Sequence, residues 1–329
     1  MGLFNIRFLV NFALLAIPIG VTLGILLGID SHRQATGQAP LYSPPASTGG
    51  SGSGSGGDSP KNNGVTKTQY CQKSFGITPK SKGQEYTLNP NQWGWDESDG
   101  GGLCMNVTTY NNATYPTNTT APAWSITWEY PQGPETQPVH AFPNIKVDGG
   151  VFPATIETLS QVDVDVEWYY AVGNDSATAT DETTLTSSSV NANVAIDMFL
   201  DSDSDNAQDS EKATYEVMVW FADFGSATQP IGLSDGAKAT QVLDGTTFSL
   251  YVGQNSLDQN VLTWVASTTT DTFNGDILPL ISALLTLDGT SYPSKTDYLG
   301  YMAFGSEAYW SQDYVTFSVP TLSIDVRTS

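Results

Sequence analysis

The chain has 329 residues, and its 34 acidic and 12 basic side chains give a formal net charge of −22. This excess of negative charge disfavours nucleic acids, acidic polysaccharides and anionic membrane surfaces as partners, and it favours a neutral or cationic partner. Charged residues make up only 14% of the chain. Thr, Ser, Asn, Gly and aromatic residues abound, which is typical of a secreted β-protein.

The N-terminal region contains one long apolar segment. After a short tail of residues 1–7, Phe8 to Gly28 form a run whose only strongly polar member is Asn11, and the run is long enough to span a hydrocarbon core of ~30 Å. The residues after Gly28 lack the small-residue pattern of a signal-peptide cleavage site. We therefore expect residues 8–28 to be an uncleaved transmembrane signal-anchor. A long signal peptide, cleaved to release a secreted protein, is the alternative.

A disordered linker is expected after this segment. Residues 29–67 show no apolar periodicity, and Ser43 to Pro60 consist almost entirely of Ser, Gly and Pro. Such a composition is typical of a flexible tether. We expect it to hold a domain of residues 68–329 on the extracellular or luminal side of a membrane.

The cysteines and the glycosylation sequons support this location. Cys71 and Cys104 are the only two cysteines, and no histidine is placed to form a zinc site with them. One disulfide is the simplest use of the pair, and two buried free thiols are the alternative. The Asn-x-Ser/Thr sequons are at Asn106, Asn112, Asn118 and Asn174.

From Thr68 onward, alternating apolar and polar segments recur between Gly, Asn, Asp and Pro clusters, which predicts an all-β sandwich or barrel. One helix is expected over Gly275 to Leu287, where Pro279 is acceptable in a first turn. Six segments are expected to be strands: Val162 to Tyr170, Val190 to Leu200, Thr214 to Phe224, Thr246 to Gly253, Val261 to Ser267 and Val315 to Val326.

The segment Thr214 to Phe224 carries an unusual pattern. A strand period of two places Glu216, Met218 and Trp220 on one face and apolar residues on the other. A carboxylate beside a thioether and an indole suits a sugar-binding surface, because pyranose rings lie against aromatic planes while carboxylates meet hydroxyls or the anomeric carbon. A solvated glutamate beside a second hydrophobic layer is the alternative.

Two further acidic residues are candidates for the same site. Asp197 alternates with Ile196 and Met198, so it can share a sheet face with Glu216 and tune its pKa. Glu307 lies in an aromatic segment near the end of the domain, where partial desolvation would favour a protonated carboxyl. An ordinary exposed aspartate and an isolated glutamate are the alternatives.

Other acidic patterns indicate structure rather than chemistry. Asp163, Asp165 and Glu167 alternate with apolar residues, as on the wet face of an amphipathic strand. The stretch DSDSDN resembles the first half of a calcium-binding loop, but Asn206 and Lys212 occupy positions that need Gly and Glu. We expect an acidic surface turn there.

Several motifs follow one another along the chain: YTLNPNQWG, VHAFPNI, VNANVAIDMFL, TYEVMVWFADFG, TQPIG, FSLYVG, VLTWVAS and YMAFGSEAYW. In this order they resemble glycoside hydrolase family 12, a family of small endoglucanases and xyloglucan-specific glucanases. Cys71 and Cys104 flank the first motif as the family's N-terminal disulfide does, and the resemblance covers about Tyr70 to Val326. It implies a β-jelly roll sandwich of two curved antiparallel sheets with one packed helix and an open cleft on the concave face. The acidic stretch Ser202 to Lys212 departs from the family pattern, but we expect it not to touch the catalytic pair.

The resemblance also implies the site residues. Glu216 would be the nucleophile and Glu307 the acid/base, Asp197 would assist the nucleophile, and the substrate would be bound by Asn91, Trp93, Met218 and Trp220. Carboxyls ~5 to 5.5 Å apart would hydrolyse internal β-1,4-glucosidic bonds with retention of configuration. Cellulose, mixed-linkage β-glucan and xyloglucan are the expected substrates, with no cofactor and no metal, and the protein is expected to be a monomer. A xylanase on a related sandwich and a non-catalytic, lectin-like glucan-binding module are the alternatives.

Overall fold

The structure of the protein is a computed structural model that describes residues 65–110, 115–135 and 137–329. These residues fall in the unit Asn62–Ser329. The expected tail, the transmembrane segment and nearly all of the linker belong to residues 1–64, outside the described residues. Within the described ranges, no helix is long and apolar enough to cross a membrane.

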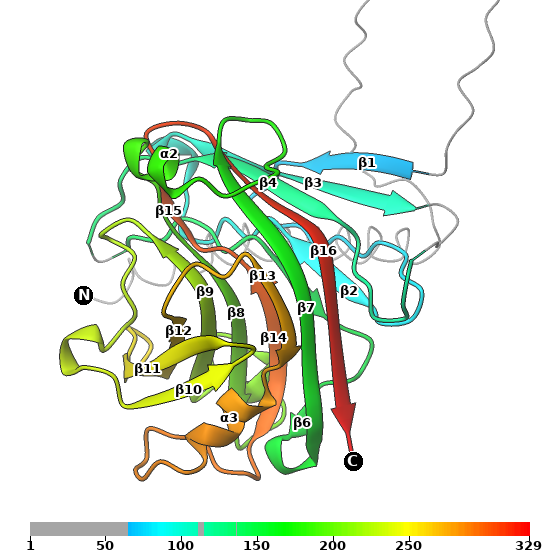
Figure 1. Ribbon diagram of the computed structural model, residues 1–329, viewed down its shortest axis with the longest axis vertical. Coiled ribbons are helices and arrows are strands. Elements are labelled where there is room, and N and C mark those ends of the chain that lie inside the picture. Colours follow the sequence, from blue (N-terminus) through cyan, green and yellow to red (C-terminus); the bar gives the residue numbers. More distant parts are fainter. Residues whose placement is uncertain (1–64, 111–114, 136) are drawn as a thin grey trace, which may run out of the picture. The chain divides into compact units, whose positions relative to one another are not determined.

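Two β-sheets form most of this unit (Figure 1). The six-stranded sheet is antiparallel throughout, in the order β1-β3-β4-β16-β7-β13. Its strands are β1 (Val65–Tyr70), β3 (Gly102–Tyr110), β4 (Trp124–Glu129), β7 (Leu159–Val172), β13 (Thr272–Asp276) and β16 (Val315–Thr328). Because β1 starts at Val65, three residues that were expected in the linker pair with β3 instead.

The ten-stranded sheet follows the order β10-β11-β12-β9-β8-β14-β5-β2, with β15 paired to β8 and β6 paired to β14. The strand β12 runs parallel to β9, so the expectation of two purely antiparallel sheets is wrong at this pair. The β10-β11-β12 meander reverses the chain twice and inserts β12 beside β9. The strands are β2 (Tyr86–Asn89), β5 (Asn144–Val147), β6 (Ala154–Thr155), β8 (Asn191–Asp201), β9 (Tyr215–Phe224), β10 (Ala239–Leu243), β11 (Thr246–Gln254), β12 (Asn260–Ala266), β14 (Tyr298–Gly305) and β15 (Ala308–Trp310).

The six predicted strands are confirmed as β7, β8, β9, β11, β12 and β16, but the helical prediction needs correction. The helix α3 (Leu278–Leu284) has Pro279 in its first turn but is shorter than expected, because Gly275 belongs to β13. A second helix, α2 (Glu182–Ser187), was not expected; Asp181 caps it. The 3-10 helices are η1 (Glu97–Asp99), η2 (Ile156–Thr158), η3 (Asn206–Gln208) and η4 (Leu233–Asp235).

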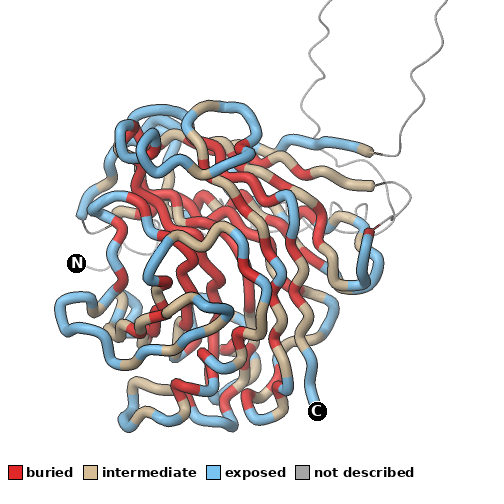
Figure 2. The backbone as a smooth tube through the Cα atoms, viewed as in Figure 1, coloured by how far each residue is buried: buried red, intermediate tan, exposed pale blue. Residues whose placement is uncertain are grey.

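The main core lies between the two sheets and is rich in aromatic residues. Phe317 of β16 packs against Trp168 and Tyr170 of its own sheet, with ring centroids 6.0 and 5.2 Å apart. It also lies 6.2 Å from Phe304 of β14, which in turn packs against Phe221 of β9. Figure 2 shows the buried residues concentrated in the strands. This core covers the face of the ten-stranded sheet that is turned to the six-stranded sheet. The opposite, outer face of the ten-stranded sheet does not take part in this core.

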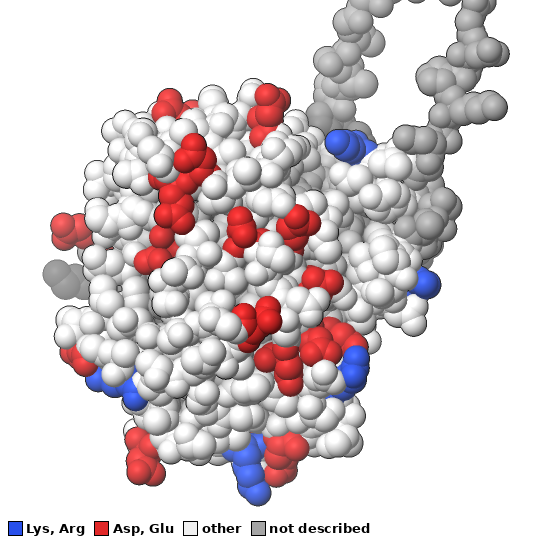
Figure 3. All heavy atoms as spheres, viewed as in Figure 1, with Lys and Arg blue, Asp and Glu red and all other residues white. Residues whose placement is uncertain are grey.

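The outer face of the six-stranded sheet is polar, as the alternation in β7 predicted. Asp165 is exposed while Val164 and Val166 are buried. Figure 3 shows acidic side chains spread over the viewed face with few basic ones among them. Arg327, the one arginine of the described region, donates to Asp325 at 2.6 Å and lies 3.7 Å from Asp163.

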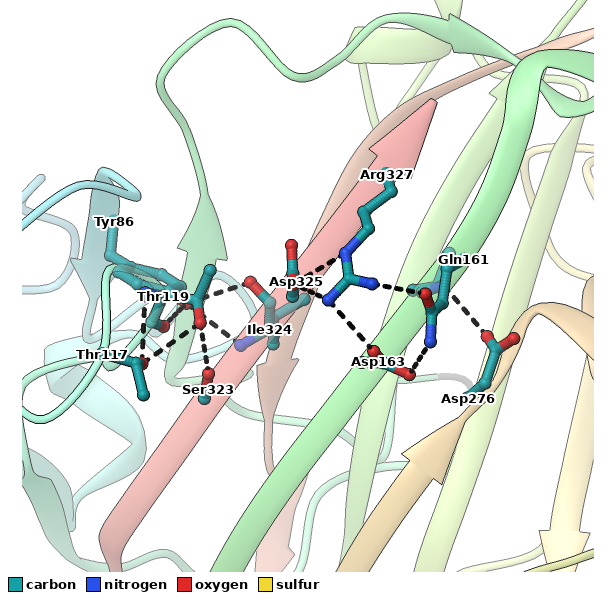
Figure 4. A network of polar contacts seen from close by, with 11 residues as sticks. Tyr86, Thr117, Thr119, Gln161, Asp163, Asp276, Ser323, Ile324, Asp325 and Arg327 are labelled. Carbon is teal, nitrogen blue, oxygen red and sulfur yellow. Dashed lines mark hydrogen bonds and ion pairs between the residues drawn. The ribbon is translucent and has the colours of Figure 1, made fainter. Parts of the chain in front are cut away.

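A hydrogen-bond network joins the two sheets near the C-terminus (Figure 4). The Tyr86 hydroxyl extends from β2, donates to the carbonyl of Thr119 at 2.5 Å and accepts the N–H of Ile324 at 3.1 Å. Ser323 and Thr119 share a hydroxyl hydrogen bond of 2.7 Å. Tyr86 therefore ties an edge strand of the ten-stranded sheet to β16.

The disulfide and the sequons can be located, with one exception. A disulfide joins Cys71 to Cys104, which confirms the predicted pairing. Asn118 and Asn174 are exposed. The side-chain oxygen of Asn106, in β3, accepts a hydrogen bond from Gln69. The fourth sequon residue, Asn112, lies outside the described residues.

Candidate active site

The three acidic residues that the sequence singled out come from adjacent parts of the ten-stranded sheet. Glu216 belongs to β9, Asp197 to the neighbouring β8, and Glu307 to the connection between β14 and β15. The residues that alternate with Glu216 and Asp197 pack in the main core, so both acids lie on the opposite, outer face. These core residues are Ile196, Met198, Val217 and Val219.

The register of β8 and β9 brings Asp197 and Glu216 close together. Asp197 lies opposite Met218, and Glu216 lies opposite Phe199. Side chains two residues apart along a strand share a face, so all four point outward. Side chains at opposite and at diagonal positions on one sheet face interact. Asp197 and Glu216 are diagonal neighbours, so their carboxyls lie close together.

Glu307 reaches the same face from β14, the other neighbour of β8. The strand β14 ends at Gly305, opposite Ala195, and β15 pairs with β8 again from Ala308. Between these points Glu307 donates its backbone N–H to Oδ1 of Asn193 at 2.9 Å and accepts the backbone N–H of Asn193 at 3.2 Å. The side-chain amide of Asn193 also donates to Oε2 of Glu307. Asn193 thus fixes both the backbone and the carboxyl of Glu307.

Both glutamates have strongly raised pKa values. Burial raises the pKa of Glu307 to about 7, the negative charge of Glu216 adds to this, and hydrogen bonds from Asn193 and Tyr309 oppose it. Burial likewise raises the pKa of Glu216 to about 7, and a hydrogen bond from Asn255 opposes the effect. Two neighbouring carboxyls that titrate near neutral pH can divide the roles of acid and nucleophile between them.

Asp197 is the most strongly buried of the three acids. It is 8% exposed, and its Oδ1 accepts no hydrogen bond from a described residue. Burial, followed by the charges of Glu216 and Glu307, raises the pKa of Asp197 well above its usual range. A proton on Asp197 avoids two negative charges side by side when Glu216 is ionised.

Met218 and Trp220 form the apolar part of this face. They belong to a small cluster with Ala195 and Val261, separate from the main core. The indole N–H of Trp220 lies 3.3 Å from the sulfur of Met218, and both side chains are buried. They lie on the same sheet face as Glu216, and their place in substrate binding stays a prediction.

Asn91 and Trp93 lie further away, beyond the end of β2. Trp93 is 52% exposed, as a sugar-stacking side chain would be before substrate binds. Asn91 has a left-handed backbone, and its carbonyl accepts the N–H of Phe142 at 3.0 Å. Within the described ranges, neither side chain has a recorded hydrogen bond to the three acids. Their place in substrate binding stays a prediction.

The polar residues that hold the glutamates were not predicted from the sequence. For Asn193 a signal existed, because it lies four residues before Asp197 and so shares its strand face. Asn255 lies in the connection between β11 and β12, where no periodicity applies. Only the pairing of β12 with β9 brings it to Glu216.

The acidic stretch DSDSDN begins at the last residue of β8, Asp201, and forms the turn that leads into η3. Asp201 accepts hydrogen bonds from the backbone N–H groups of Asp203 at 2.8 Å and Thr214 at 2.9 Å. The carboxylate of Asp201 therefore stabilises the backbone at this turn. The described part of the chain contains no group of three or more His, Cys, Asp or Glu side chains arranged to hold a metal ion.

Comparisons with known proteins identify the family of the chain. The model of glycosyl hydrolase family 12 matches residues 84–327. The chain is 31% identical over 237 residues to xyloglucan-specific endo-beta-1,4-glucanase A of Emericella nidulans, a match that covers 72% of this chain and 83% of that protein. It is 29% identical over 243 residues to the protein of the same name from Aspergillus aculeatus, covering 73% and 86%. The fold is similar to that of endoglucanase 3 from Trichoderma harzianum, with a TM-score of 0.61 and 21% identity over 79% of this chain and 98% of that chain.

Proposed function

The chain belongs to glycosyl hydrolase family 12, and from this membership we propose that it is a retaining endo-β-1,4-glucanase that hydrolyses internal bonds of β-glucans. Glu216 is the proposed nucleophile and Glu307 the proposed acid/base. The observation that carries these roles is the convergence of two half-buried glutamates, each with its pKa raised to about 7, on one face of the sheet. Asp197 beside Glu216 is the proposed assisting acid.

The first step needs Glu216 ionised and Glu307 protonated. Glu216 attacks the anomeric carbon and forms a glycosyl ester, while Glu307 gives its proton to the departing glycosidic oxygen. The charge of Glu216 raises the pKa of Glu307, so an ionised nucleophile favours a protonated acid. A protonated Asp197 adds no second negative charge beside the attacking oxygen.

The second step reverses the role of Glu307. Once Glu216 is an ester, its negative charge is gone, so the pKa of Glu307 falls and the carboxylate can accept a proton from water. The water attacks the anomeric carbon from the face that the leaving group vacated. Two inversions give net retention of configuration.

Xyloglucan is the substrate that we propose first, because the two curated relatives described above are named as xyloglucan-specific. The test is a panel in which the full-length protein is incubated with xyloglucan, mixed-linkage β-glucan, cellulose and xylan. Oligosaccharides should appear from xyloglucan or another β-1,4-glucan. Hydrolysis of xylan alone would favour the xylanase, and binding without hydrolysis would favour the lectin-like module.

We also propose that residues 8–28 anchor the enzyme in a membrane and that residues 29–64 tether the domain on the extracellular or luminal side. The apolar run, the Ser/Gly/Pro-rich linker, the sequons and the disulfide support this arrangement. The protein should then fractionate with membranes and retain its N-terminal peptide. A mature N-terminus between Asp30 and Gln38 would instead identify a secreted enzyme.

A further inference from the structure

The connection between β11 and β12 lies directly beside the proposed nucleophile. Val261 of β12 is opposite Glu216 in the parallel pair with β9. Asn255 is the first residue of this connection, and its side-chain oxygen accepts the backbone N–H groups of Leu257 at 3.0 Å and Gln259 at 3.1 Å. The oxygen of Asn255 therefore organises the turn, and its amide nitrogen is free for other contacts.

Both hydrogens of that amide nitrogen are used. Nδ2 of Asn255 donates to Oε2 of Glu216 at 3.2 Å and to Oε1 of Gln259 at 2.8 Å. Gln259 is only 4% exposed, and its own Nε2 donates to the carbonyl oxygens of Ser210 at 2.9 Å and Ala213 at 2.8 Å. A carbonyl oxygen only accepts, so these two carbonyls turn Nε2 of Gln259 toward them and Oε1 toward Asn255.

These contacts determine which way the amide of Asn255 faces. In a flipped amide, Oδ1 would meet two acceptors, Oε1 of Gln259 and the carboxylate of Glu216, while Nδ2 would meet two backbone N–H donors. All four contacts would be lost, and buried polar groups would be left unpaired. Because neither amide titrates, the same N–H is presented to Glu216 over the whole working pH range.

We propose that Gln259 is a positioning residue for the nucleophile: it holds the amide of Asn255 with an N–H toward Oε2 of Glu216. An N–H donated to a carboxylate favours its ionised form. Oε1 of Glu216 accepts no hydrogen bond from a described residue, so it is the oxygen left for attack. The inference rests on the proposed role of Glu216.

The proposal also connects the acidic loop to the site. From the sequence, the stretch Ser202 to Lys212 was expected not to touch the catalytic pair. Ser210 belongs to this loop and Ala213 follows it, and their carbonyls are the acceptors that hold Gln259. The loop therefore acts on Glu216 through two amides rather than by direct contact.

The test compares the wild type with Gln259→Leu and Asn255→Asp on an aryl β-cellobioside that has a good leaving group. Such a substrate needs little help from Glu307, so the acidic limb of kcat/KM against pH reports the ionisation of Glu216. Asn255→Asp keeps an acceptor for the turn, removes the N–H and adds a negative charge beside Glu216, so it should move the acidic limb up by about one pH unit or more, with about ten-fold or more lower kcat/KM below that limb. Gln259→Leu, which lets the amide of Asn255 rotate, should move the limb in the same direction.

The matched control is Gln254→Leu. Gln254 precedes Asn255 and is exposed. Its side chain donates a hydrogen bond to Asn260 and has none to the side-chain amide of Asn255 or Gln259. Its profile should superimpose on that of the wild type. If a folded Gln259→Leu protein also superimposes on the wild type in its acidic limb, the inference is overturned; should that variant not fold, Gln259→Met, which is closer in size to the native side chain and also lacks both amide contacts, decides in the same way.

A measurement without turnover separates this inference from the proposed function. An NMR titration of the side-chain carboxyl carbon of Glu216 should give a higher pKa in Gln259→Leu than in the wild type and in Gln254→Leu. Equal values in all three would overturn the inference. A wild type that hydrolyses no β-glucan would overturn the proposed function. The titration would then still decide whether Gln259 acts on Glu216 through Asn255.

Discussion

Glu216 and Glu307 titrate as a pair, because the charge of one raises the pKa of the other. The productive state holds one proton, on Glu307. Two interacting groups lose their protons at apparent pKa values that belong to the pair, and their mutual repulsion separates these values. The profile of kcat/KM against pH should therefore be bell-shaped, with a maximum near the pKa of about 7 that burial gives to both carboxyls.

The roles of the two glutamates are distinguished by Glu216→Gln and Glu307→Gln. Each should abolish most hydrolysis of glucan while leaving the fold and glucan binding largely intact, because the size of the side chain hardly changes. Glu307→Gln should still form the glycosyl-enzyme from substrates with good leaving groups, and added azide should release a β-glycosyl azide. Glu216→Gln should block the first step for every substrate.

The stereochemistry checks the same assignment independently. NMR of wild-type hydrolysis should first show the β-anomer at the new reducing end. An initial α-anomer would mean inversion, and Glu216 could no longer be the nucleophile.

Asn193 is expected to set both the position and the ionisation of Glu307. Asn193→Ala removes a hydrogen bond that lowers the pKa of Glu307, so the alkaline limb of kcat/KM should move to higher pH. Loss of a hydrogen bond to a charged group should also reduce kcat by about ten-fold or more. Asn274→Ala, on an exposed position of β13, is the matched control and should leave both quantities unchanged. An unmoved alkaline limb in Asn193→Ala would contradict this role.

At the scale of the elements, the disulfide pins β1 to the six-stranded sheet. β1 is an edge strand with a mostly exposed face, and Tyr70 at its end lies opposite Met105, next to the disulfide between Cys71 and Cys104. Little apolar burial holds the strand, so the covalent link carries much of its attachment.

Removing this link should release β1 before the rest of the fold. The variant with Cys71→Ser and Cys104→Ser should lose about 3–4 kcal/mol of unfolding free energy. Hydrogen exchange should be faster for the amides of β1, while those of β8 and β9 should stay protected, since these strands lie in the other sheet. Equal acceleration in all three strands would contradict a local role for the disulfide.

At the scale of the whole molecule, ionisation of Glu216 and Glu307 lowers the free energy of unfolding at high pH. The pKa of Glu216 and that of Glu307 rise from the ordinary value of 4.5 to about 7 on folding. The folded state thus binds these protons more tightly than the unfolded state. The contribution of this proton binding to the free energy of unfolding is fully present below about pH 4.5 and is lost as the pH rises to about 7.

Neutral substitutions should therefore stabilise the protein only at high pH. Urea unfolding of Glu216→Gln and Glu307→Gln at pH 8 should give unfolding free energies about 1–3 kcal/mol above that of the wild type, and the difference should vanish near pH 4. Glu135→Gln, at an exposed glutamate, is the control and should match the wild type at both pH values. A wild type as stable as the two variants at pH 8 would contradict the raised pKa values.

Six of the strands and the two faces of the site strands could be predicted from the sequence alone. A period of two is a local property, so Val217 and Val219 could be assigned to the core and Glu216 to the outer face without knowledge of any partner strand. The acidic residues, the disulfide and the family could be predicted for the same reason, because motifs and spacings are written along the chain.

The contacts that hold the site residues follow from the tertiary structure. The parallel pairing of β12 with β9 brings Asn255 to Glu216, and the pairing of β8 with β15 brings Asn193 to Glu307. The short helix α2 depends on a cap and on packing against β7, and a six-residue segment carries too little periodicity to be recognised. Pairing direction, register and turn geometry arise from contacts between residues far apart in the chain, and the pattern within one strand does not record them.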